Sequence, residues 1–312
     1  MQAILTVAFP VFALIGIGWF AGTRRMLGAH GTAALNGFVT WFALPAMLFS
    51  ALSRVPLGTI LNWPFVIAYG GAMVLTFAAG MLAARLWSRA DFMHMSIHGL
   101  TAAFGNVGYM GIPLCAAAFG TAGVLPATLA VCIGGAVMMT SAIIIIEFSR
   151  NRGGGKARTL LRVASAVTRS PILQAVALGM LCGGLQIPVP AAIARFLDLL
   201  GAAAGPCALF AIGHFISEQG LPRRLGEILL ATAGKMLLQP LIAVALLSFF
   251  PDMPAMWWKS TILLAALPGA SNSFVLAKEY NSFVEGASAT ILLSTVVSVF
   301  TVSTLVVVLG LG

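Results

Sequence analysis

The sequence predicts an all-α polytopic membrane protein with ten transmembrane helices, arranged as two inverted five-helix repeats. Three observations lead to this prediction. Of the 312 residues, 60% are hydrophobic and only 8% are charged, which is far outside the composition of soluble globular domains. The apolar residues fall in runs long enough to cross a bilayer. Proline-containing patterns also recur between the two halves of the chain.

The apolar runs define the elements, because about 20 apolar residues are needed for one helical crossing. We expect helices over residues 3–22, 32–52, 62–87, 95–119, 123–148, 171–188, 196–217, 228–250, 257–281 and 285–310. The first run has no basic segment before it, so we expect a retained helix and not a cleaved signal peptide. The chain then divides into a first repeat over 1–150, a basic linker over 151–170 and a second repeat over 171–312.

The basic residues predict the orientation, because cytoplasmic loops carry an excess of Lys and Arg. Thirteen follow odd-numbered helices: Arg24, Arg25, Arg85, Arg89, Arg150, Arg152, Lys156, Arg158, Arg162, Arg169, Arg223, Arg224 and Lys278. Three lie on the other side: Arg54, Arg195 and Lys259. We therefore expect a cytoplasmic linker and both termini outside. Topology accounts for most of the net charge of +9, so no nucleic-acid partner is needed.

The repeat rests on two proline patterns. "PAMLF" at Pro45 matches "PCALF" at Pro206, an offset of 206 − 45 = 161, and Pro113 in the fourth run matches Pro268 in the ninth, an offset of 268 − 113 = 155. The two members of each pair lie five runs apart, which is an odd number, so the two copies would face opposite ways. The alternative is that these prolines are unrelated, since transmembrane helices tolerate proline.

The fourth run contains a group of poor helix formers: Gly105, Asn106, Gly108, Gly111 and Pro113. We expect the helix to unwind from Gly105 to Ile112 and to restart at Pro113. The ninth run repeats the device in "ALPGASNSF", where Pro268, Ser271 and Asn272 surround the break.

Unwound backbone at bilayer depth must face protein or a wet cavity, and each restarted half-helix turns a partly positive N-terminus inward. Two such ends from inverted repeats predict an anion site. Asn106, Ser271 and Asn272 could donate hydrogen bonds to the anion, and the alternative is that they only cap the broken helices.

Ionisable residues inside the runs are further candidates. Lys235 could neutralise the anion, act as a counter-charge at the crossing of the two broken helices, or extend to the membrane surface. His214 and Glu218 are four residues apart on one helix face and could carry protons, although a packed histidine is the alternative. No run has a carboxylate at its centre, which disfavours sodium coupling and predicts no metal site.

The motifs "GNVGYMGIPL" in the fourth run and "ALPGASNSFVLAKEYN" in the ninth resemble the auxin efflux carrier family, which includes plant auxin exporters and bacterial permeases proposed for malate or malonate. The resemblance implies scaffold and transport subdomains that interleave between the repeats, a crossing at Asn106, Gly111, Pro113 and Pro268, and a bacterial inner-membrane location. It also implies alternating access. The short central linker and "GASNS" differ from the plant exporters and favour a smaller dicarboxylate over auxin.

The functional expectation is a secondary transporter for a small organic anion, a mono- or dicarboxylate such as malonate, malate or an auxin-like acid. An anion channel, a ligand-sensing receptor and a sodium-coupled symporter are the alternatives. We expect no enzyme and no cofactor, because the sequence lacks HExxH, GxSxG and GxxxxGK[ST] motifs. The lipid bilayer is the expected environment, and a homodimer is left open.

Overall fold

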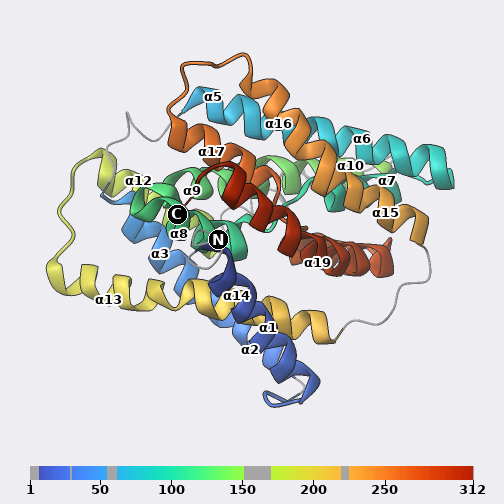
Figure 1. Cartoon of the computed structure of the whole chain (residues 1–312). Coiled ribbons are helices and arrows are strands. Elements are labelled where there is room, and N and C mark those ends of the chain that lie inside the picture. The colour runs from blue at the N-terminus through green and yellow to red at the C-terminus, as the bar shows by residue number, and fades with distance from the viewer. Residues whose placement is uncertain (1–6, 29, 55–61, 151–169, 219–224, 312) are drawn as a thin grey trace.

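The structure is a computed structural model that describes residues 7–28, 30–54, 62–150, 170–218 and 225–311. These residues form helices joined by short connections (Figure 1). Within them the β-type pairing is limited to a single antiparallel bridge, between Gly105 and Gly269. The predicted basic linker falls almost entirely outside the described residues.

The first half of the chain contains these elements: α1 (Phe9–Thr23), α2 (Gly31–Phe38), η2 (Val39–Ala43), α3 (Leu44–Leu52), α5 (Trp63–Phe65), η3 (Val66–Gly70), α6 (Gly71–Ser88), α7 (Phe92–Ala103), η4 (Val107–Gly111), α8 (Ile112–Phe119), η5 (Gly120–Gly123), α9 (Val124–Cys132), η6 (Ile133–Met139) and α10 (Thr140–Arg150). The second half contains α12 (Pro171–Gly184), α13 (Ala191–Ala202), α14 (Ala204–Ser217), α15 (Leu225–Ala233), η7 (Gly234–Leu238), α16 (Gln239–Leu247), α17 (Ala255–Ala265), α18 (Ser271–Glu279) and α19 (Val284–Val308). Each of the ten predicted ranges contains helix.

Six continuous helical segments are long and apolar enough to cross a membrane: Gly31–Leu52, Trp63–Ser88, Val107–Gly135, Ala191–Ser217, Leu225–Leu247 and Val284–Val308. Two shorter apolar helices, Phe9–Thr23 and Pro171–Gly184, accompany them. The prediction of an all-helical membrane protein is confirmed. The finer prediction of ten spans in two inverted repeats stays a prediction.

Wider π-helical turns precede three of the prolines. The turns η2, η4 and η7 end two residues before Pro45, Pro113 and Pro240, respectively. Proline has no N–H, and its ring collides with the carbonyl four residues earlier. A π turn shifts the hydrogen bonding to the fifth residue and relieves this conflict, so the helix continues through the proline.

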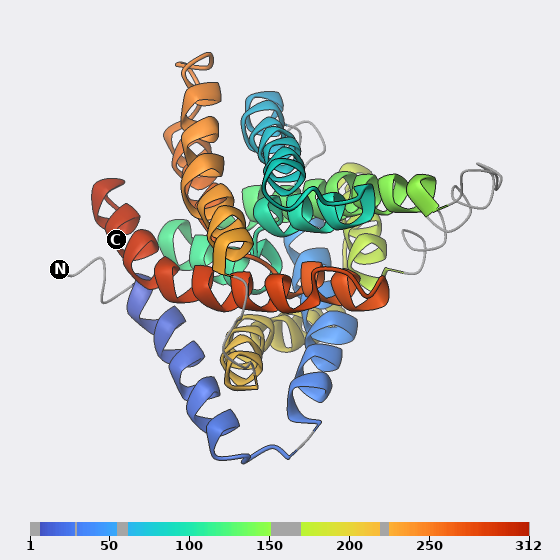
Figure 2. The ribbon, with the colours of Figure 1, turned by 90° about the vertical axis from the view of Figure 1, so that its right-hand side faces the viewer.

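The helices form two groups that pack internally. In the first group, α1 lies along α14, and α12 lies along α3. In the second group, α6 packs on α7 and α16, and α15 packs on α19. Figure 2 shows α1 and α2 on one side of α19, and α6, α15 and α16 on the other. The two groups meet around η4, which contacts α14 of the first group and α17, and α17 packs on α16 of the second group.

Glycines allow the close approach of α1 and α14. A Cβ atom on Gly213 would lie 1.9 Å from the carbonyl oxygen of Ile15, and one on Gly18 would lie 2.1 Å from that of Phe210. Small residues of this kind let the backbones of transmembrane helices pack directly against each other.

Replacement of Gly213 should therefore separate these two helices. We expect Gly213→Ala to lower the apparent melting temperature of the detergent-solubilised protein, because overpacking a close interface costs about 1–3 kcal/mol. Gly16→Ala is the matched control, since a Cβ on Gly16 of α1 would meet nothing within 4 Å. Equal melting temperatures for the two variants would contradict the packing described here.

Candidate functional site

Two broken helices cross at the centre of the molecule. The first break separates α7 from η4, and the second separates α17 from α18. The backbone N–H of Asn106 donates to the carbonyl of Pro268 at 2.8 Å, and that of Ala270 donates to the carbonyl of Phe104 at 3.0 Å. The two breaks therefore satisfy part of each other's main-chain hydrogen bonding, which unwound backbone requires at membrane depth.

The first break is shorter than the sequence predicts. The predicted unwinding as far as Ile112 is wrong, because helical turns resume at Val107, immediately after Asn106. Pro113 is not at the break but near the start of α8, inside a helix that η4 continues. Pro268 does lie in its break, as predicted, and the neighbouring Gly269 donates its N–H to Ser294 Oγ at 3.0 Å.

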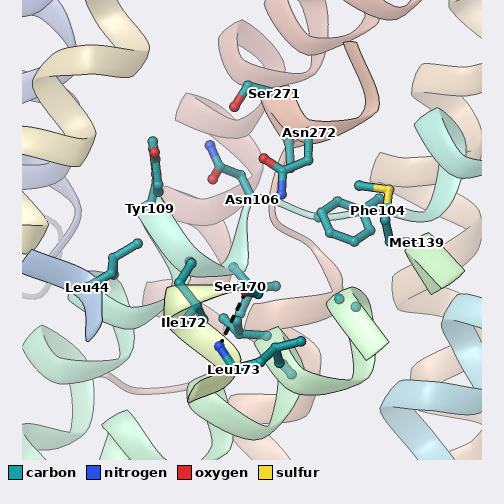
Figure 3. Close-up of a pocket in the computed structure, with 18 of the residues that line it drawn as sticks. Leu44, Phe104, Asn106, Tyr109, Met139, Ser170, Ile172, Leu173, Ser271 and Asn272 are labelled. Atoms are coloured by element: carbon teal, nitrogen blue, oxygen red, sulfur yellow. Dashed lines mark hydrogen bonds between the residues drawn. The ribbon is translucent and has the colours of Figure 1, made fainter. Parts of the chain in front are cut away.

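A cavity of about 260 Å³ lies beside the crossing. Five of the predicted site residues line it: Gly105, Asn106, Gly108, Ser271 and Asn272. Figure 3 shows Asn106, Ser271 and Asn272 gathered at one side of the cavity, with Ser170, Ile172 and Leu173 at the opposite side. None of the described residues that line the cavity is charged.

The cavity receives the beginnings of three helices. The turn η4 starts directly after Asn106, α18 starts at Ser271, and α12 starts directly after Ser170. Ser170 Oγ caps α12 by accepting from the N–H of Leu173 at 3.4 Å. The sequence did not predict that the N-terminus of α12, at Ser170, belongs to this site, because only the folded chain brings α12 to the crossing.

The amide of Asn106 is free to bind a ligand. Its side chain makes no capping hydrogen bond to η4 and none to any other residue in the described ranges. The first turn of α18 is likewise uncapped by a side chain, with Ala270 at the N-cap position. For Asn106, the alternative that the side chain only caps its helix is not supported.

A tyrosine and a threonine form a second polar feature that the sequence did not indicate. Tyr109 on η4 and Thr40 on η2 both line the cavity, and their hydroxyl oxygens are 2.9 Å apart. This hydrogen bond joins η4 to η2. The 69 residues between the partners explain why no local pattern predicts it.

Lys235 is fully buried behind the crossing and does not line the cavity. Its Nζ donates to the carbonyl oxygen of Ala265, the last residue of α17, at 2.7 Å. A Cβ on Gly105 would lie 3.1 Å from Lys235 Cε, so one backbone segment separates the amine from the cavity. Of the three alternatives, the geometry fits a counter-charge at the crossing and not a side chain extended to the membrane surface.

The remaining predicted residues lie elsewhere. Gly111 packs against α17, where an added Cβ would come within 2.9 Å of Leu267 and Leu264 side-chain atoms. His214 is buried, with Nδ1 2.6 Å from Thr32 Oγ1 and 3.4 Å from Glu218 Oε1. Neither His214 nor Glu218 lines the cavity.

Long apolar helices around a cavity that is lined by apolar side chains and a few polar ones, with two broken helices crossing beside it, are typical of the class of integral membrane transport proteins. A family model described as "Membrane transport protein" matches residues 3–306. The chain belongs to this family, which is the auxin efflux carrier family that its motifs resemble.

Relatives similar to the chain over nearly its whole length carry transporter names. A "Putative malonate transporter" of Rhizobium meliloti (strain 1021) is 31% identical over 314 residues, covering 100% of this chain and 98% of the relative. An "Uncharacterized transporter" of Methanothermobacter thermautotrophicus is 27% identical, with 92% of each chain covered. "Uncharacterized transporter YfdV" of Escherichia coli (strain K12) is 22% identical, with 91% of each chain covered.

Proposed function

We propose that the protein is a secondary transporter that moves a small dicarboxylate across the membrane by alternating access at the crossing. The observation that carries this proposal is the cavity, where three helix N-termini and the free amide of Asn106 converge. Helix N-termini present unpaired N–H groups and a partial positive charge of about half a unit to an anion.

A dicarboxylate fits the distribution of polar groups. Asn106, Ser271 and Asn272 would hold one carboxylate, and the hydroxyls of Tyr109 and Thr40 would lie within the same cavity for the other. The modest volume of about 260 Å³ favours a compact substrate over an aromatic auxin. Malonate is the first substrate to test, because a relative with 31% identity is named for it.

The packing supports two inverted repeats. The contact of α1 with α14 has its counterpart in the contact of α12 with α3. The first helix of each repeat therefore packs on the second helix of the other repeat. Gly105 and Gly269 pair at the crossing with an offset of 269 − 105 = 164, close to the 161 of the Pro45 and Pro206 patterns. The first helix group would be the scaffold, and the second would carry the substrate.

The lining residues suggest which side the cavity faces. Ile143 on α10 and Ser170 before α12 lie near the two ends of the basic linker, and both line the cavity. The excess of Lys and Arg favours a cytoplasmic linker. We infer an inward-facing state, with both termini outside.

The competing functions predict different behaviour. A channel on the same fold would not show saturable exchange, and a receptor would bind without transport. A sodium symporter would place a cation near the crossing, where the positive charge of Lys235 would repel it.

The transport test is exchange in proteoliposomes. We expect labelled malonate to enter liposomes preloaded with unlabelled malonate, with saturation and counterflow, in the absence of sodium. Liposomes without protein are the control. Uptake that rises linearly with concentration would favour a channel, and no exchange of malonate, malate or any other small carboxylate would overturn the proposal.

A further inference from the structure

Three ionisable side chains meet inside the second helix group, away from the cavity. His94 Nε2 lies 3.2 Å from Glu227 Oε2, and the Glu227 residue is only 4% exposed. His98, one turn further along α7, is fully buried. None of the three was predicted, because the partners on α7 and α15 are about 130 residues apart in sequence.

The hydrogen bonds of His98 depend on its protonation. Its Nδ1 lies 2.9 Å from the carbonyl oxygen of Gly80 on α6, and its Nε2 lies 3.1 Å from the carbonyl oxygen of Glu227 on α15. Carbonyl oxygens only accept hydrogen bonds, and only the imidazolium carries an N–H on both ring nitrogens. The charged ring therefore bonds α6 and α15 to α7, whereas the neutral ring can satisfy only one of the two contacts.

The surroundings leave these three groups to interact mainly with each other. Glu227 and His94 are the ionisable side chains closest to His98 in their effect, and the hydrogen-bond partner of His98 on α6 is the carbonyl of Gly80. The ring of Phe283, just before α19, covers both histidines with centroids 5.1 Å away. Arg85 on α6 and four other charged residues on the adjoining elements are exposed: Asp91, Lys278, Glu279 and Glu285.

Buried hydroxyls continue from this cluster toward the crossing. Thr76 on α6, Thr232 on α15 and Thr290 on α19 have buried oxygens without a hydrogen-bond partner among the described residues. Thr232 lies between Glu227 and Lys235 on one continuous helix. Glu227 and Lys235 are eight residues apart, which is about 12 Å along the helix axis. Buried hydroxyls without a protein partner are places where internal water can bind, and such water would connect the cluster to the crossing.

We propose that Glu227, His94 and His98 form a proton-binding site through which the protein couples carboxylate transport to protons. This inference rests on the proposed transport function. A bound proton completes both contacts of His98 and holds α6 and α15 against α7, whose C-terminal end forms the crossing. Proton release breaks one contact. The pair His214 and Glu218 predicted from the sequence is the alternative coupling site, and it lies apart from this cluster, in contact with Thr32 of α2.

The test compares driven accumulation with passive exchange in proteoliposomes. A pH gradient of one unit, coupled to one proton per malonate, supports an accumulation ratio of up to about tenfold. We expect the wild-type protein to accumulate malonate under this gradient and Glu227→Gln to lose the accumulation. Exchange at equal pH should stay within about twofold of wild type, because Glu227 does not line the cavity. His98→Gln should behave like Glu227→Gln, and His214→Gln should keep the accumulation.

Each outcome separates the two proposals. Wild-type protein without any exchange would overturn the transport function itself. Exchange without accumulation in wild type, or accumulation that persists in Glu227→Gln, would overturn the proton site alone. Loss of accumulation in His214→Gln with retention in Glu227→Gln would also overturn it. Infrared titration of the solubilised protein gives a readout independent of transport, since a carboxyl signal that changes with pH should disappear in Glu227→Gln.

Discussion

Asn106→Ala is expected to abolish most malonate exchange while the protein stays folded. The amide side chain faces the cavity without another partner in the described structure, so its hydrogen bond is available to a carboxylate. Loss of a hydrogen bond to a charged group costs about 1.5–3 kcal/mol, or about 10- to 150-fold in affinity. The main-chain bond from residue 106 to the Pro268 carbonyl does not need the side chain, so the crossing should persist.

The measurement is the concentration dependence of exchange, together with the melting temperature. Asn106→Asp is a sharper second variant, because it keeps the shape and puts a negative charge beside the anion; its affinity should fall below that of Asn106→Ala. Asn36→Ala, on α2 and outside the cavity lining, is the control and should exchange malonate like wild type. Wild-type affinity in Asn106→Ala would remove this residue from the site.

The sequence predicts the helices and the ninth-run break because their causes are local. Apolar runs of membrane length leave the backbone no alternative to helix in lipid. Pro268 lacks an N–H and is followed by Gly269, so the helix stops there. Ser271 and Asn272 follow the break by only a few residues, so the sequence alone places them in the first turn of the next helix, α18.

The features that the sequence predicted wrongly or missed depend on contacts between residues that are far apart in the chain. Pro113 has the same chemistry as Pro268, but the π turn η4 absorbs its missing hydrogen bond and moves the break to Gly105. The choice between a π turn and an open break depends on what surrounds the helix. The pairs Tyr109 with Thr40 and His98 with Glu227 depend on how helices pack, which no single run of residues encodes.

N-terminal and C-terminal helix ends lie on different sides of the crossing. The starts of η4 and α18 face the cavity, whereas α7 and α17 end at the crossing with their carbonyl groups. The C-terminal carbonyls carry partial negative charge and would oppose an anion nearby. Lys235 donates to one of these carbonyls, at Ala265, and thereby offsets the unfavourable ends. In its ammonium form, Lys235 would add positive charge behind the crossing to the environment that the N-termini begin.

Lys235→Met is consequently expected to weaken malonate binding without destabilising the fold. At an effective dielectric constant of about 20, two unit charges about 4 Å apart interact by about 4 kcal/mol. The backbone segment between the amine and the cavity makes the separation larger, so we expect a loss of about 2 kcal/mol, which is about 30-fold in affinity. The variant leaves the Ala265 carbonyl without its donor, a cost of about 1–3 kcal/mol. It also removes the cost of burying an ammonium group, which is several kcal/mol. The melting temperature should therefore stay level or rise.

This pair of measurements separates the roles of Lys235. Reduced affinity with retained stability identifies an electrostatic contribution to the anion site. A lower melting temperature with unchanged affinity would instead show that the lysine only supports the crossing, and the proposed charge effect would be wrong. Lys278→Met is the control, because Lys278 is exposed near the end of α18 and should affect neither quantity. A fully buried lysine is retained at a cost to stability, and the position of Lys235 behind Gly105 is the basis for the proposal that this cost serves anion binding.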